Sequence, residues 1–179
     1  MPNELLDKSN LTQLERVIRL HLAAAYNYAR WLTRNDVDAE DVVQEACARA
    51  WKYSNTFRGE NAKSWFMTTV RNAAFSWIKK NRQPQNVPLD DELDNEGVSQ
   101  QSLPVITDAS DIMALKAAMN QLAPEFIEVL VLKELEGYSY HEIAQITEVP
   151  VGTVMSRLSR ARAKLQVLLS ETETSGERK

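Results

Sequence analysis

A proline-bracketed acidic stretch divides this chain into two parts. Residues 83–110 contain six Asp and Glu but no Lys or Arg, and their apolar residues follow no helical or strand period. Each proline fixes its own φ and restricts the residue before it, so Pro84, Pro88 and Pro104 exclude a long regular helix here. The predicted organisation is a first lobe at residues 10–82, a flexible acidic linker at 83–110, a second lobe at 111–170 and a disordered tail at 171–179.

Composition argues against several classes of function. The single Cys47 cannot form an intramolecular disulfide, and the two His, His21 and His141, are too scattered to suggest a zinc site. The sequence contains no dinucleotide-binding motif, no P-loop and no visible nucleophile–base pair, so we expect no enzyme, no cofactor and no metal. It also lacks a membrane-spanning apolar run and a signal peptide, which predicts no membrane insertion and a cytoplasmic location.

Positive charge is concentrated in two stripes, although the net charge is −4. Residues 71–82 hold four Lys and Arg with no acid, and residues 149–170 hold another four with no acid. Local basic stripes on a mildly acidic protein suggest that a polyanion binds at defined places. Two solvated helix faces would explain the charge alone equally well.

The first lobe is predicted to be helical, because its apolar residues recur at spacings of three and four. The expected helices are 11–34, 39–53 with Asp38 as N-cap, and 64–81. The side of the third helix that faces away from its apolar residues shows Thr68, Arg71, Asn72, Phe75 and Lys79. An exposed ring beside cations suits single-stranded nucleic acid, because bases can stack on the ring and phosphates can pair with the cations. The alternative is that Phe75 packs on the first helix or the linker.

The second lobe contains a predicted helix-turn-helix. Helices are expected at 111–121 and 124–136, with Pro124 in a first turn and Gly137 as a C-cap. Ser139 and Glu142 then form a capping box for a short helix. A break at 147–150 separates that helix from a longer one at 151–169, and a short helix, a tight turn and a longer helix make this motif.

The last helix has the pattern of a DNA-recognition helix. Its predicted buried stripe is Val151, Val154, Leu158, Ala161, Leu165 and Leu168. The opposite face consists of small residues flanked by Met155, Arg160, Arg162 and Lys164. Small side chains permit close approach to a major groove, and Arg can read guanine or hold phosphate. A solvated coiled-coil-like helix is the alternative, but such helices usually mix charges of both signs.

Together the two lobes resemble the extracytoplasmic-function (ECF) group of bacterial RNA polymerase sigma factors. In the first lobe the similarity rests on residues 38–46 (DAEDVVQEA), 57–59, 65–66 and 70–74. In the second lobe it rests on residues 122–124, 136–144 and 151–162. The resemblance implies an all-α fold in which a sigma region 2 bundle (10–82) and a sigma region 4 helix-turn-helix (111–170) are small domains joined by the acidic linker.

The resemblance also implies a role for each matching position. The face that carries Asp41, Gln44 and Glu45 would bind the clamp helices of the largest polymerase subunit, and the flap is a second polymerase contact. Contacts to the −10 element are implied for Arg58, Lys63, Arg71, Asn72, Phe75 and Lys79, with Asn72 holding a flipped base. Contacts to the −35 element are implied for Thr153, Met155, Ser156, Arg157, Arg160 and Arg162. An anti-sigma factor clamped between the lobes is a further implied partner.

The function indicated is therefore an alternative sigma factor, which binds core RNA polymerase and directs promoter-specific initiation from −10 and −35 elements. The alternative is a dimeric helix-turn-helix regulator that acts without being a polymerase subunit. Such a regulator would bind a palindromic operator on its own and would not need the acidic face around Asp41. A sigma factor with small basic faces should bind free DNA only weakly.

Overall fold

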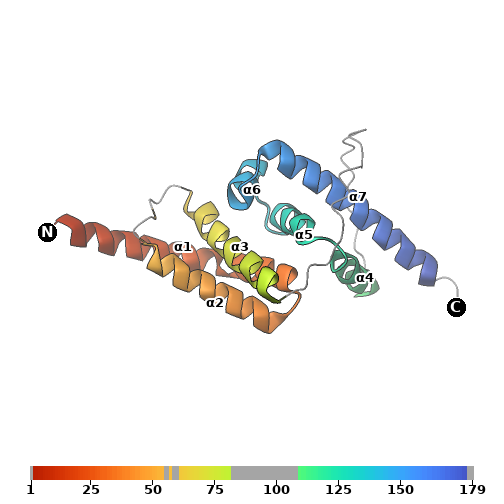
Figure 1. The fold of residues 1–179 in the computed structure, drawn as a ribbon, viewed down its shortest axis with the longest axis horizontal. Coiled ribbons are helices and arrows are strands. Elements are labelled where there is room, and N and C mark those ends of the chain that lie inside the picture. The colour runs from red at the N-terminus through yellow and green to blue at the C-terminus, as the bar shows by residue number, and fades with distance from the viewer. Residues whose placement is uncertain (1, 55–56, 58–60, 82–108, 177–179) are drawn as a thin grey trace.

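The computed structural model describes residues 2–54, 57, 61–81 and 109–176, and most of these residues are helical. Side chains are described only for those that lie between residues 11 and 171. These residues form seven α-helices and one π-helical turn (Figure 1). Of the predicted linker, 83–108 lies outside the described residues, and its last two residues open a helix. Residues 177–179 of the predicted tail and the candidate DNA contact Arg58 lie outside them as well.

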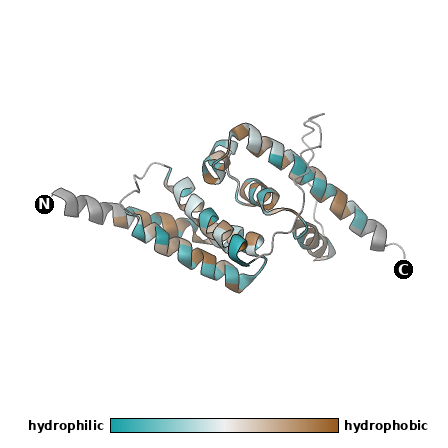
Figure 2. Ribbon diagram, in the orientation of Figure 1, coloured by the Kyte–Doolittle hydropathy of each residue, from teal (hydrophilic) through white to brown (hydrophobic). Residues whose placement is uncertain are grey.

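The first lobe is a three-helix bundle of α1 (Pro2–Thr33), α2 (Asp36–Lys52) and α3 (Ala62–Asn81), each packed on the other two. Its helices are amphipathic, and Figure 2 shows hydrophobic and hydrophilic residues alternating along each ribbon. The predicted N-cap of α2 was wrong. The cap is Asn35, whose Oδ1 accepts the backbone N–H of Val37 at 2.9 Å, because α1 ends just before it with Arg34 at φ 63°.

The second lobe consists of α4 (Ala109–Met119), α5 (Pro124–Leu130), the π-helical turn η2 (Val131–Leu135), α6 (Tyr140–Thr147) and α7 (Val151–Gly176). The predicted end signals are confirmed: Pro124 lies in the first turn of α5, and Gly137 has φ 69°. The capping box is also present, since Ser139 Oγ accepts the Glu142 N–H at 3.2 Å and Glu142 Oε2 accepts the Ser139 N–H at 2.8 Å. α7 extends seven residues past its predicted end at Leu169, because no helix breaker precedes Gly176.

The wide turn of η2 was not predicted, and it changes which side chains face the core. The N–H of Glu136 bonds to the carbonyl of Val131 at 3.0 Å, five residues back. A turn of this kind carries an extra residue and rotates the residues after it about the helix axis. Leu135 is consequently 52% exposed, whereas Tyr138 is buried. In the first lobe, the spacing of apolar residues in the predicted helix 39–53 puts Trp51 on its buried side, but Trp51 is 43% exposed near the end of α2.

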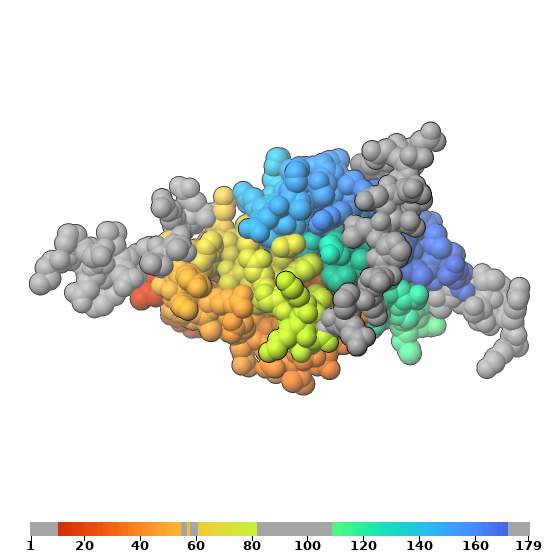
Figure 3. All heavy atoms as spheres, viewed as in Figure 1, coloured from red at the N-terminus to blue at the C-terminus, as the bar shows by residue number. Residues whose placement is uncertain are grey.

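The two lobes pack against each other and share one core. α3 lies against α6, and α1 lies against α5 and η2. In the space-filling view, the yellow-green surface of α3 adjoins the blue surface of α6 and of the start of α7 (Figure 3). Buried side chains from Leu14 to Leu165 form one continuous cluster across both lobes. This packing was not predicted, because a flexible linker places no constraint on how two lobes meet.

The capping box gives a direct test of the helix-turn-helix. We expect Ser139→Ala to lower the free energy of unfolding by about 1 kcal/mol, because the substitution leaves the Glu142 N–H of α6 without its acceptor. Chemical denaturation followed by circular dichroism would measure this change. The control is Ser76→Ala in the interior of α3, where alanine is the better helix former. Equal stability of the two variants would contradict a capping role.

Candidate nucleic-acid interface

The tight turn between α6 and α7 orients α7 as a candidate recognition helix. α6 ends at Thr147, its C-cap residue Glu148 adopts a left-handed conformation at φ 56°, and α7 begins at Val151. Val154, Leu158 and Leu165 of α7 are buried, as the sequence pattern predicts. The opposite side of α7 is therefore the side that a nucleic acid can approach.

Most of the candidate −35 residues are partly covered in this conformation. Met155 is 45% exposed. The others are of intermediate exposure, namely Thr153, Ser156, Arg157, Arg160 and Arg162. Arg162 Nε donates to Glu134 Oε1 at 3.0 Å, and Arg157 Nη1 lies 3.4 Å from Glu128 Oε1. Two of the arginines are thus paired with carboxylates of the chain itself.

The candidate −10 face of α3 is exposed only in part. Asn72 and Lys79 are exposed, as expected. Of the two alternatives for Phe75, the open stacking ring is not found: Phe75 is half-buried against the core, and the Arg71 guanidinium carbon lies 4.5 Å from its ring centroid. The Arg71 side chain itself is only 16% exposed.

Lys63, another candidate −10 contact, is also engaged by the second lobe. Its Nζ lies 3.8 Å from the centroid of the Tyr138 ring, which is close enough for a cation–π interaction. The same Nζ is 3.5 Å from Glu142 Oε1. Lys63 and Arg71 lie on one helix, so the second lobe holds α3 at two points.

Glu128 of α5 is the centre of the contacts between the lobes. It is the one charged side chain that is buried among the described residues, with 0% exposure. Its Oε2 accepts from Arg71 Nε at 2.8 Å and from the Tyr28 hydroxyl at 3.3 Å, and its Oε1 faces Arg157. The sequence analysis missed this residue. A lone acid inside the apolar run 126–132 is the signal that could have found it.

Burial and pairing oppose each other at this cluster. Burial raises the pKa of Glu128, although the hydrogen bond and positive charge of Arg71 act in the opposite direction. Burial would lower the pKa of Arg71, but its hydrogen bond and charge attraction to Glu128 outweigh burial and raise it. Burial, and then the Glu128 charge, raise the pKa of Tyr28 well above its usual value. Tyr28 is therefore a neutral donor in this site.

The acidic face of α2 is exposed, unlike the two basic faces. Asp41, Gln44 and Glu45 are all exposed and lie opposite the buried Val42 and Ala46. Glu45 forms an ion pair with Arg49 at 2.7 Å, one turn farther along the helix. The structure thus brings these three side chains together on one accessible surface.

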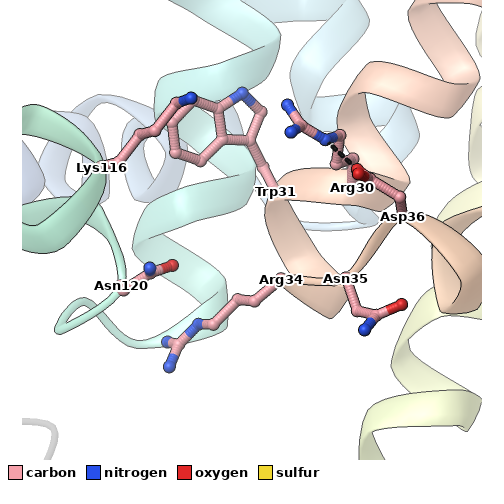
Figure 4. Close-up of a pocket in the computed structure, with 7 residues that line it drawn as sticks. All are labelled: Arg30, Trp31, Arg34, Asn35, Asp36, Lys116 and Asn120. Carbon is pink, nitrogen blue, oxygen red and sulfur yellow. Dashed lines mark hydrogen bonds and ion pairs between the residues drawn. The ribbon is translucent and has the colours of Figure 1, made fainter. Parts of the chain in front are cut away.

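A pocket of about 280 Å³ lies where the end of α1 meets the second lobe (Figure 4). Its lining residues are Arg30, Trp31, Arg34, Asn35, Asp36, Lys116 and Asn120. Arg30 is paired with Asp36, and Arg34 donates to the Leu122 carbonyl at 3.1 Å. The pocket therefore marks another junction between the lobes.

The described residues contain no group of three or more His, Cys, Asp or Glu that could hold a metal ion. Within the same part of the chain, no helix has the length and apolar character needed to cross a membrane.

Comparison with known proteins identifies the family. The family profile for sigma-70 region 2 matches residues 17–83, and that for sigma-70 region 4 matches residues 112–165. The chain is 33% identical over 156 residues to the ECF RNA polymerase sigma-E factor of Escherichia coli, covering 82% of this chain and 80% of that protein. It is 28% identical to the ECF sigma factor SigE of Mycolicibacterium smegmatis, covering 92% of this chain and 65% of that relative.

A solved structure agrees with this assignment. The sigma factor RpoE from Bartonella quintana, in complex with the anti-sigma factor NepR, superposes with a TM-score of 0.66. The two chains are 32% identical, and the match covers 87% of this chain and 96% of RpoE. The chain belongs to the ECF RNA polymerase sigma factors, which direct promoter-specific transcription initiation with RNA polymerase and are not enzymes. The alternative of a dimeric regulator needs only the second lobe and leaves the region 2 match unexplained.

The hydroxyl of Tyr28 tests the buried cluster. We expect Tyr28→Phe to lower the free energy of unfolding by about 1–2 kcal/mol, because a buried charged acceptor loses a donor. Urea denaturation would measure this change. Tyr26→Phe is the matched control on the same helix, since the Tyr26 hydroxyl faces Asp36 at an exposed site and should contribute less than about 0.5 kcal/mol. A larger effect at Tyr26 would contradict the assignment.

Proposed function

We propose that this sigma factor reads the −10 element with α3 and the −35 element with α7, while α2 binds the clamp helices of the largest polymerase subunit. The observation that carries the proposal is the presence of two basic helix faces, one on each lobe of one chain, together with a separate exposed acidic face. A DNA-binding regulator needs only one such basic face, whereas a promoter-reading polymerase subunit needs all three surfaces.

The proposed DNA contacts divide between the two lobes. In region 2 they are Arg58, Lys63, Arg71, Asn72, Phe75 and Lys79. In region 4 they are Thr153, Met155, Ser156, Arg157, Arg160 and Arg162. Met155 can contact a thymine methyl but cannot pair with guanine, so base reading on α7 falls to its polar and cationic residues. The lobes are proposed to be the domains 10–82 and 111–170, joined by the acidic linker 83–110 and followed by the tail 171–179.

Partners beyond promoter DNA are proposed for the same surfaces. Region 4 would contact the polymerase flap, and an anti-sigma factor would bind between the two lobes. The structure of RpoE supports an anti-sigma partner, because that similar sigma factor is in complex with the anti-sigma factor NepR. The proposed place of action is the cytoplasm, where bacterial polymerase and promoter DNA are found.

Run-off transcription with bacterial core polymerase over a library of promoter fragments tests the proposal. We expect specific transcripts that require the added chain. The result that would overturn the proposal is no transcript and no co-elution with core polymerase, combined with tight binding of the free protein to a palindromic duplex.

The acidic face of α2 can be tested with a closely matched pair of variants. Glu45 and Glu15 are both exposed helical residues that form an ion pair with an Arg four residues later at 2.7 Å. We expect Asp41→Ala/Glu45→Ala to weaken binding to core polymerase about tenfold, and Glu45→Ala alone to weaken it less. Glu15→Ala should have no effect on the affinity measured by fluorescence anisotropy. Equal losses for Glu45→Ala and Glu15→Ala would argue against this face.

Base capture on α3 can be tested at Asn72. We expect Asn72→Ala to reduce open-complex formation about tenfold at a promoter found in the library, because a flipped base loses its polar partner. Permanganate reactivity of the melted strand would report this loss. Asn81→Ala, at an exposed position near the end of the same helix, is the control and should retain melting. Full melting by Asn72→Ala would exclude the assigned role.

A further inference from the structure

One buried carboxylate connects the helices that the proposed function assigns to different promoter elements. Arg71 of α3 donates to Glu128 at 2.8 Å, and Arg157 of α7 lies 3.4 Å from the other oxygen of the same carboxylate. The side chains of the two arginines are only 16% and 21% exposed, and that of Glu128 is 0% exposed. In this conformation both guanidinium groups are paired with the Glu128 carboxylate, so neither is free to bind a DNA phosphate.

The spacing of the promoter elements excludes this arrangement on bound DNA. Positions −10 and −35 are about 25 base pairs apart, which is about 85 Å of B-form duplex at 3.4 Å per base pair. A single carboxylate cannot contact Arg71 and Arg157 while α3 and α7 lie on sites so far apart. The closed arrangement of the lobes and simultaneous binding of both elements are therefore mutually exclusive.

We propose that Glu128 is an intramolecular latch that keeps the free chain closed and self-inhibited. The inhibited activity would be promoter binding, and this part of the proposal rests on the proposed function. The latch includes contacts around the carboxylate: Lys63 against Tyr138 and Glu142, and Asn27, whose Nδ2 donates to Glu136 Oε1 at 2.8 Å. Together with the contact between Glu128 and Arg71, they hold two candidate DNA-binding residues of α3, Lys63 and Arg71, against the second lobe.

The chemistry of the latch makes it reversible. A buried ion pair gains attraction but loses the hydration of both charges, so its net contribution to closing is small. When the lobes separate, Glu128 loses Arg71 and Tyr28 but regains water, and Arg157 remains beside it in its own lobe. Binding of the exposed α2 face to polymerase can then shift the equilibrium toward the open form, provided that polymerase binds the open form more tightly.

The latch can be tested by measuring the distance between the lobes directly. Spin labels would be placed on cysteines introduced at the exposed Lys52 of α2 and Gln166 of α7, in a Cys47→Ala background. Pulsed electron spin resonance then reports the distribution of distances in the free full-length chain. We expect one short, narrow distribution for the otherwise unchanged protein.

Two variants should open the chain by different routes. Glu128→Gln keeps the side-chain volume but leaves two guanidinium groups without a counter-charge. Asn27→Asp leaves that cluster intact and places a carboxylate against Glu136. We expect each to raise the ratio of open to closed molecules about tenfold, seen as a longer and broader distance distribution. Glu125→Gln, three residues before Glu128 on α5, removes the same charge and should leave the distribution unchanged.

The outcomes separate the latch from the proposed function. A long, broad distribution for the starting protein, or unchanged distances in both variants, would overturn the latch. If Glu128→Gln fails to fold by circular dichroism, the distances of Asn27→Asp decide the question. At a promoter that supports run-off transcription, opening should lower the sigma concentration needed for half-maximal transcript several-fold. A lack of any transcript would refute the proposed function. The distances between the spin labels would still show whether Glu128 holds the lobes together.

Discussion

The arrangement of the two lobes depends on the buried carboxylate of Glu128. An ionised carboxylate is stable away from water only when donors surround it, and here the donors come from three helices. Tyr28 and Arg71 belong to the first lobe, and Arg157 belongs to the second. Removing the first lobe would take away two of these partners, so the position of α5 against α1 and α3 is tied to the charge of one residue.

The three surfaces proposed to bind polymerase and promoter DNA differ in how accessible they are in this closed form. The acidic face of α2 around Asp41 is exposed, whereas Arg71 and Lys63 of α3 are engaged by the second lobe. Arg157 of α7 is held in the same cluster. With the proposed roles, polymerase would bind before the proposed DNA-contacting faces become free. This order agrees with the weak binding to free DNA expected from its charge.

Local signals in the sequence predicted the helices well and their ends less well. The apolar stripe of α7 and the capping box at Ser139 depend on neighbours three or four residues apart, so a pattern in the sequence contains them. The wide turn at 131–135 was missed, because an extra residue in one helical turn leaves no mark on the period. The exposure of Trp51 was missed for a different reason, since this residue lies near the end of α2, where a helical period does not show whether another element covers the side chain. The sequence left open whether Phe75 is exposed or packed, and the ring is half-buried against the core with the Arg71 guanidinium one turn away beside it.

The sequence by itself determined an all-helical chain of two lobes, a helix-turn-helix, an exposed acidic face and two basic stripes. Each of these depends on side-chain chemistry and spacing within one helix or one turn. Only the tertiary structure decided that the lobes close on each other and that the two stripes share one acid. The partners of Glu128 lie 57 and 100 residues away in the first lobe, beyond any local pattern. The choice among such partners is made by packing and desolvation, which exist only once the chain has folded.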